Sequence, residues 1–227
     1  MLISGKGSPA EPASVRNAIS YWSLHDNKIL RKFRGHTDLV NSISMCPAND
    51  TFLTTSNDRT VRLWSLDKAG CVASVQLPDS CKGNPLATFD SSGLVIAIEA
   101  AKENGKDYLL NLYDARNFSG GSFSDLEVTH DALSSNAQTH ASNAALANGD
   151  WKSLSFNKAG SRIVVGNDMG ATFLLDGYEG TVLRTFVGAV NQPAVSCITG
   201  DDRSLLVAEG DGSISCWELE SGVMKKR

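Results

Sequence analysis

One six-residue stretch, Val61-Arg62-Leu63-Trp64-Ser65-Leu66, constrains the fold of this chain most, because weaker copies of it recur along the sequence. The copies are centred on aromatic or large apolar residues, which are Trp22, Trp64, Tyr113, Leu175 and Trp217. Successive centres are 42, 49, 62 and 42 residues apart. A strand signature that recurs about every 40 to 45 residues is typical of a β-propeller built from four-stranded blades.

The two longer steps coincide with polar insertions. Lys102 to Asp107 is a short polar stretch in the 49-residue step, and a segment rich in Ser, Asn and Ala lies at about 124–149 in the 62-residue step. The second segment has few large apolar residues, so its composition favours disorder. We therefore expect a flexible N-terminus over residues 1–17 and a partial propeller over residues 18–227, interrupted by the insertion at about 124–149.

Residues 36–77 can be divided into one complete blade. Alternating apolar residues and turn residues predict strands at Leu39–Met45, Thr51–Thr55, Thr60–Leu66 and Cys71–Leu77. No window of eleven or more residues here has the 3.6-residue period of a helix. Four short strands with even turn spacing favour a propeller blade over a fold that contains helices.

The same pattern, less regular, predicts the other blades. Ala18–Leu24 and Ile29–Phe33 are the last two strands of a partial blade at the start of the chain. The later strands are expected at Pro85–Phe89, Leu94–Ile98, Tyr108–Tyr113, Phe123–Val128, Trp151–Phe156, Arg162–Val165, Ala171–Leu175, Val182–Phe186, Ala194–Ile198, Ser204–Ala208, Ser213–Trp217 and Val223–Lys225. The fold class is thus an all-β WD40 β-propeller with about four complete four-stranded blades plus a partial one.

Four side chains of the complete blade have the spacing of a buried hydrogen-bond network. They are His36, a hydroxyl from Thr54 or Ser56, Asp58 and Trp64. A carboxylate can hold the tautomer of an imidazole, and a buried indole N–H needs an acceptor. A catalytic His-Asp-Ser set and a metal ligand are the alternatives, but the spacing is that of a repeat, which favours the structural network.

Composition and motifs narrow the function further. The net charge of −4 gives no electrostatic case for general nucleic-acid binding. The five cysteines are an odd number without a C-x-x-C pair, so we expect reduced thiols in the nucleus or cytoplasm. We find no hydrolase, zinc-protease or phosphate-binding motif, and we expect no catalytic residue and no cofactor. His130 and His140 flank the insertion, but two histidines in a polar segment are a weak metal signal, and we expect no metal.

A family resemblance lies next to the complete blade. The segment Leu24-His25-Asp26-Asn27-Lys28-Ile29-Leu30, followed by Phe33 and Gly35-His36, resembles the corresponding segment of the WD-repeat protein 82 family. Leu112-Tyr113-Asp114-Ala115-Arg116 and several shorter matches follow in the same order. The budding-yeast relative in this family is the second WD-repeat subunit of the Set/COMPASS complex.

The resemblance implies a function that no motif shows by itself. It implies a non-catalytic scaffold or adaptor subunit in the nucleus, within complexes that methylate lysine 4 of histone H3. It also implies membership of a protein phosphatase 1 complex in transcription termination, and contact with the phosphorylated tail of RNA polymerase II. The family ring has seven blades, so we expect this incomplete chain to be poorly soluble or completed by further residues.

Two sets of residues are candidates for partner binding. Arg34 and Arg59 would lie on one face of the propeller, where guanidinium groups can bind phosphate. The alternative is that both are solvated loop charges. Tyr113-Asp114-Ala115-Arg116 also matches the short box by which propellers act as substrate receptors of cullin-RING ubiquitin ligases. A substrate receptor of a cullin-RING ubiquitin ligase is therefore the alternative function.

Overall fold

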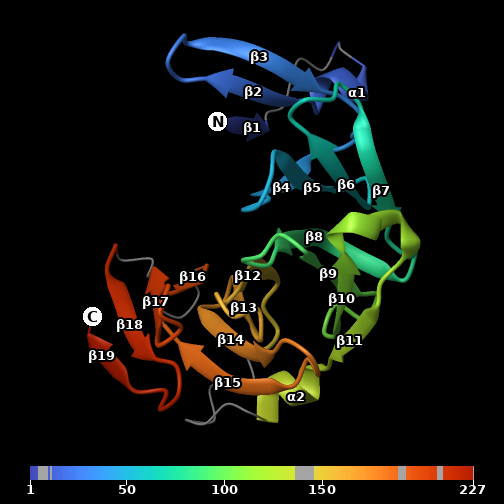
Figure 1. Ribbon diagram of the computed structural model, residues 1–227. Coiled ribbons are helices and arrows are strands. Elements are labelled where there is room, and N and C mark those ends of the chain that lie inside the picture. The colour runs from blue at the N-terminus through green and yellow to red at the C-terminus, as the bar shows by residue number, and fades with distance from the viewer. Residues whose placement is uncertain (5–9, 11, 136–145, 189–192, 209–211, 227) are drawn as a thin grey trace.

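The strands of the chain form five antiparallel sheets that follow one another around an open arc (Figure 1). The computed structural model describes residues 1–4, 10, 12–135, 146–188, 193–208 and 212–226. Four sheets have four strands each, connected in chain order, and the first sheet has three. Four complete blades and a partial one confirm the fold predicted from the repeat.

The partial blade contains one more strand than the sequence predicted. It consists of β1 (Leu2–Ser4), β2 (Ile19–Ser23) and β3 (Lys28–Phe33), with the short helix α1 (Ala13–Arg16) between the first two strands. Strand β1 pairs with β2 along its whole length. Residues 2–4 and 13–16, which the sequence analysis assigned to a flexible N-terminus, thus form a strand and a short helix, and β1 pairs with the edge of β2.

The second blade agrees with the predicted strands to within one residue at each end. Its strands are β4 (Val40–Met45), β5 (Thr51–Ser56), β6 (Thr60–Ser65) and β7 (Cys71–Gln76). Strand β5 is almost wholly buried, which suits its β-branched and aromatic side chains. The turn at residues 57–59 joins β5 to β6 and carries Arg59 with a positive φ of 61°.

In the third blade, the insertion predicted at about 124–149 begins later than the sequence indicated. Its strands are β8 (Cys81–Phe89), β9 (Val95–Lys102), β10 (Tyr108–Asp114) and β11 (Ser124–Val128), and the 3₁₀ segment η1 (Ala115–Gly120) follows β10. Because β11 pairs with β10 as the outer strand, residues 124–128 belong to the blade. Helix α2 (His130–Ser135) comes next, and residues 136–145 lie outside the described part.

The fourth and fifth blades each have four antiparallel strands. The fourth consists of β12 (Trp151–Phe156), β13 (Arg162–Asn167), β14 (Ala171–Asp176) and β15 (Val182–Val187). The fifth consists of β16 (Val195–Ile198), β17 (Ser204–Ala208), β18 (Ile214–Glu218) and β19 (Met224–Lys226). All eight agree with the sequence prediction to within two residues. Among the described helices, none is long and apolar enough to cross a membrane.

The hydrophobic core is divided among the junctions between neighbouring blades. Ile19 and Phe33 of the first blade pack with Phe52 and Trp64 of the second, and three further clusters join each later pair. The first strand of each complete blade faces the inside of the arc (Figure 1). Since each blade buries one apolar face against the next, the blades hold one another rigidly in place.

Turns at one end of the blades also connect neighbours. Asp202, in the β16–β17 turn, accepts hydrogen bonds from the backbone N–H groups of Lys158 at 2.8 Å and Ala159 at 3.0 Å in the β12–β13 turn. It also accepts one from Asn157 Nδ2 at 3.1 Å. On the other side, Ser91 Oγ donates to the Lys158 carbonyl. These contacts link three consecutive blades.

Candidate interaction face

Two loops of the second blade meet at the opposite end from those turns. The loop from β3 to β4 contains His36, and the turn from β5 to β6 contains Asp58. The Thr37 N–H donates to Asp58 Oδ2 at 2.9 Å, and the Asn57 N–H donates to the Leu39 carbonyl at 2.9 Å. These contacts fix the loops side by side, so they form one face of the blade.

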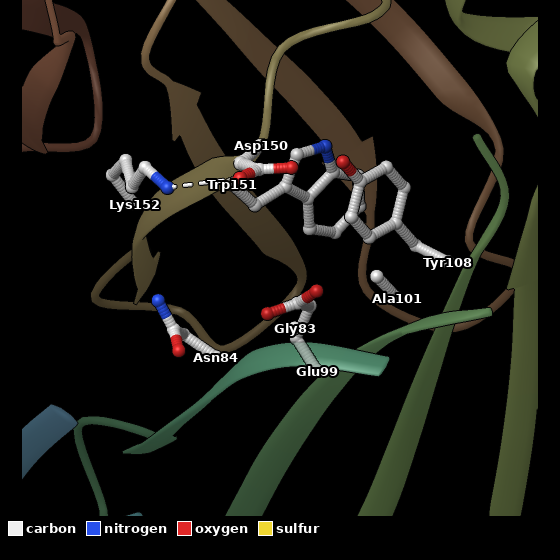
Figure 2. A pocket seen from close by; sticks show the side chains of 8 residues that line it. All are labelled: Gly83, Asn84, Glu99, Ala101, Tyr108, Asp150, Trp151 and Lys152. Atoms are coloured by element: carbon white, nitrogen blue, oxygen red, sulfur yellow. Dashed lines mark hydrogen bonds and ion pairs between the residues drawn. The ribbon is translucent and has the colours of Figure 1, made fainter. Parts of the chain in front are cut away.

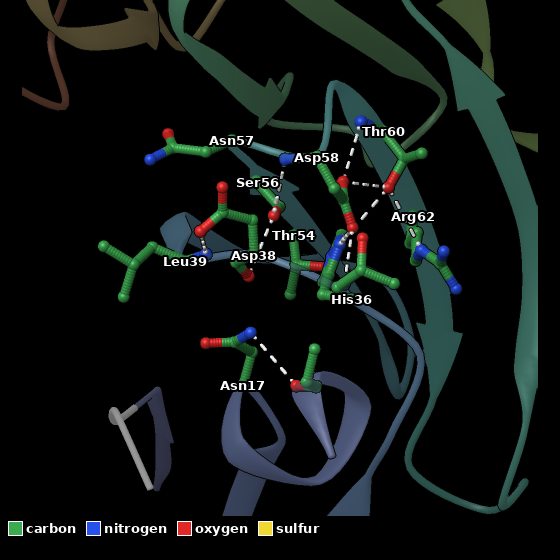
Figure 3. Close-up of polar contacts among 12 residues, drawn as sticks. Asn17, His36, Asp38, Leu39, Thr54, Ser56, Asn57, Asp58, Thr60 and Arg62 are labelled. Carbon is green, nitrogen blue, oxygen red and sulfur yellow. Dashed lines mark hydrogen bonds and ion pairs between the residues drawn. The ribbon is translucent and has the colours of Figure 1, made fainter. Parts of the chain in front are cut away.

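A single line of hydrogen bonds holds this face to the core, as Figure 3 shows for its outer members. Trp64 Nε1 donates to Thr54 Oγ1 at 2.8 Å, and Thr54 Oγ1 lies 2.7 Å from His36 Nε2. His36 Nδ1 lies 2.9 Å from Asp58 Oδ2. The carboxylate accepts the Nδ1 proton, so Nε2 of a neutral imidazole is left to accept the proton of Thr54.

Asp58 is the anchor of this line. Its side chain is only 6% exposed. Burial by itself raises the pKa of Asp58, but hydrogen bonds from His36, from Thr60 Oγ1 at 2.6 Å and from the Thr37 N–H together hold that pKa well below its usual value. Thr60 was not among the residues predicted for this network, although a hydroxyl two residues after a turn aspartate is a recognisable signal of such a contact.

The hydrogen-bonding groups of the network are therefore all satisfied by other groups of the chain. Each of its polar groups has a partner within the blade, and Trp64 and His36 are fully buried. Gly35 lets the loop pass close to the indole, because a Cβ there would lie 3.2 Å from the Trp64 ring and closer still to the Arg62 guanidinium. A buried and satisfied set of this kind stabilises a loop rather than performing chemistry.

The two arginines predicted to bind a partner lie on the loops that the network holds. Arg34 is exposed and comes two residues before His36. Arg59 follows Asp58, and its Nη1 is 2.7 Å from Asp79 Oδ1 at the start of the next inter-blade loop. Because Asp79 is 93% exposed, this ion pair is weak and can exchange for another anion.

The box at Tyr113-Asp114-Ala115-Arg116 has a different environment. Tyr113 is buried and packs against Phe118. The Asp114 carboxylate accepts hydrogen bonds from Nε and Nη2 of Arg116 at 2.9 and 2.7 Å. The hydrogen bonds from Arg116 lower the pKa of Asp114 to about 2. The arginine of the box is thus already paired with its own aspartate, which gives no support to the ubiquitin-ligase alternative.

The described residues form neither a metal-binding cluster nor a disulfide. They contain no group of three His, Cys, Asp or Glu side chains that could hold a metal ion. His130 Nδ1 lies 3.4 Å from Ser134 Oγ in α2, and His140 falls outside the described residues. All five cysteines are free thiols, as the sequence predicted.

Comparison with known proteins agrees with the repeat and the blade geometry. The family model "WD domain, G-beta repeat" matches residues 27–65, which run from the end of the partial blade through β6. The five-sheet fold and the His36 network at the blade end define the chain as a WD-repeat β-propeller protein.

Three curated relatives are similar to the chain over most of its length. The chain is 32% identical over 211 residues to WD repeat-containing protein 82 of Drosophila melanogaster, covering 92% of this chain and 59% of that protein. It is 31% identical to COMPASS component SWD2 of Saccharomyces cerevisiae, covering 92% and 58%. Set1 complex component swd2 of Schizosaccharomyces pombe is 26% identical, covering 89% and 53%.

These matches agree with the family that the sequence resembles. Over 92% of its length the chain is similar to WD repeat-containing protein 82 and to SWD2. It spans somewhat more than half the length of the curated relatives it matches. None of the three is named for a ubiquitin ligase, so neither the geometry nor the relatives support that alternative function.

Proposed function

We propose that this protein is a non-catalytic scaffold subunit of a nuclear complex that methylates lysine 4 of histone H3. The observation that carries this proposal is the match over 92% of the chain to COMPASS component SWD2 and over 89% to Set1 complex component swd2. Blades that pack rigidly on one another suit a platform that presents loops to partner proteins.

The absence of catalysis is part of the proposal. The environment of His36 and Asp58 in the second blade supports a non-catalytic role. Both side chains are buried, hydrogen-bonded within the blade and part of a repeat. A catalytic pair needs a free position beside it for the reacting atom. The Thr54 hydroxyl already occupies that position on the inner side of His36.

Two finer parts of the proposal concern other partners. The family resemblance supports membership of a protein phosphatase 1 complex and contact with the serine-phosphorylated tail of RNA polymerase II. Arg34 and Arg59 are the residues we propose for phosphate binding, because both lie on loops fixed by the same network. Exchange of Asp79 for phosphate would keep Arg59 paired.

Affinity purification of the endogenous protein, followed by mass spectrometry, tests the function. We expect subunits of a histone H3 lysine-4 methyltransferase to be recovered from nuclear extract. Recovery of phosphatase subunits without methyltransferase subunits would restrict the function to the second complex. If neither set is enriched over a control purification with an unrelated propeller, the proposal is wrong.

A further inference from the structure

Glu99 is a buried carboxylic acid that the interaction face does not use. It lies in β9, opposite Leu86 of β8 and Leu110 of β10, and it is 2% exposed. Within the described residues, its Oε2 has no hydrogen-bond partner. A buried carboxylate oxygen without a donor is costly, so its presence points to a group supplied from outside the chain.

Glu99 lines a small pocket between the third and fourth blades. Figure 2 shows the Glu99 carboxylate at the base of this pocket, with Asn84 on one side and the rings of Tyr108 and Trp151 on the other. The two rings stack with their centroids 4.0 Å apart and form a rigid wall. The full lining is Gly83, Asn84, Glu99, Ala101, Tyr108, Asp150, Trp151 and Lys152.

Among the described residues, no cation forms an ion pair with Glu99, although the positive charge of Lys152 favours its ionised form. Lys152, in the pocket wall, is held by Asp150 at 3.2 Å and Asp168 at 3.4 Å. The other lysines nearby are paired as well: Lys102 binds Glu127 at 2.5 Å and Lys82 binds Glu103 at 3.1 Å. The ammonium groups around the pocket are thus bonded to other carboxylates, and none of the described residues forms an ion pair with Glu99.

The size of the pocket limits what can enter. It leaves about 20 Å³ for the centre of a water-sized group. That space accepts one water molecule or one –NH₃⁺ group, but not a guanidinium or a trimethylammonium group. Burial raises the pKa of Glu99, and a cation beside it would offset the cost of keeping the carboxylate charged.

We propose that this pocket binds a primary ammonium group, such as the end of an unmodified lysine side chain on a partner peptide, with Glu99 as the counter-ion. The pocket is lined in part by residues of β8 and of the start of β12, which are the inner strands of their blades (Figure 1). The inference rests on the geometry of two blades, so it can succeed or fail independently of the proposed complex.

Titration with n-butylammonium, which reproduces a lysine side chain, tests the inference on the full protein. We expect a saturable shift of the Glu99 carboxyl carbon signal in the ¹³C NMR spectrum. The same titration with n-butyltrimethylammonium should give no saturable shift, because the charge is equal but the head group is too large. Equal binding of both cations, or no saturable shift with either, overturns the proposal and leaves water as the occupant.

Two variants locate the binding. Glu99→Gln should weaken binding of n-butylammonium at least about tenfold, whereas Glu103→Gln, which changes an exposed carboxylate on the adjoining turn, should not. A neutral amide is less costly to bury than a carboxylate, so the first variant should fold. Unchanged affinity in Glu99→Gln contradicts the proposal. Should that variant fail to fold, the comparison of the two cations decides.

Discussion

Trp64 and His36 meet at a single hydroxyl group: the indole Nε1 and the imidazole Nε2 lie 2.8 and 2.7 Å from Thr54 Oγ1. The strand core and the loop of the second blade are therefore connected through one oxygen atom. Its partners on both sides are fully buried and have no access to water. This arrangement makes the stability of the interaction face depend on Thr54.

Thr54→Val should destabilise the chain by about 1–3 kcal/mol, since it leaves the Trp64 N–H and His36 Nε2 buried without a partner. Thr172→Val is the matched control, because Thr172 is equally buried in β14 and its hydroxyl has no partner among the described residues. Chemical unfolding should show a loss for the first variant and little or no loss for the second. Equal effects would contradict the role of Thr54.

Acid should weaken the same network. The folded-state pKa of Asp58 lies below its unfolded value, so its carboxylate stabilises the fold above about pH 4, and this contribution is lost as the pH falls through the folded pKa. Urea unfolding of wild type and Asp58→Asn should differ by a constant amount above about pH 5. The difference should shrink at lower pH. A difference that does not change with pH would show that the Asp58 charge is unimportant.

Asp202→Ala should loosen the junction between the fourth and fifth blades. The change removes the acceptor of two backbone N–H groups and one side-chain amide, and we expect a loss of about 1–3 kcal/mol. Hydrogen exchange at Lys158 and Ala159 should accelerate. Asp201→Ala is the control, since Asp201 accepts hydrogen bonds from Thr199 and Arg203 within its own turn. Unchanged exchange in Asp202→Ala would contradict this link.

Arg34→Ala and Arg59→Ala should each weaken binding of a serine-phosphorylated peptide about three- to tenfold, with a larger loss at low salt. Arg203→Ala, an exposed charge at the opposite end of the blades, should have no effect. Fluorescence anisotropy with phosphorylated and unphosphorylated peptides measures the difference. If both variants retain wild-type affinity, the two arginines are solvated loop charges.

Local sequence patterns determined most of the blade architecture. The recurrent strand signature around Trp64, with turn residues between short alternating strands, predicted the complete blades because strand and turn preferences act over a few residues. The spacing of His36, Asp58 and Trp64 also predicted their association, since a repeat places equivalent residues at equivalent positions.

Only the tertiary structure decided which groups meet across blades and which are left without partners. In the structure, the shared hydroxyl is that of Thr54 and not that of Ser56, and β1 pairs with β2. Asp202 accepts a hydrogen bond from a turn more than forty residues away in the sequence. Glu99 shows most clearly what could not be predicted from the sequence. A glutamate after the apolar run Val95–Ile98 is a visible signal of a buried charge, but its lack of an ion-pair partner depends on Lys152, Asp150 and Asp168, which packing brings together from the start of β12 and from the β13–β14 turn.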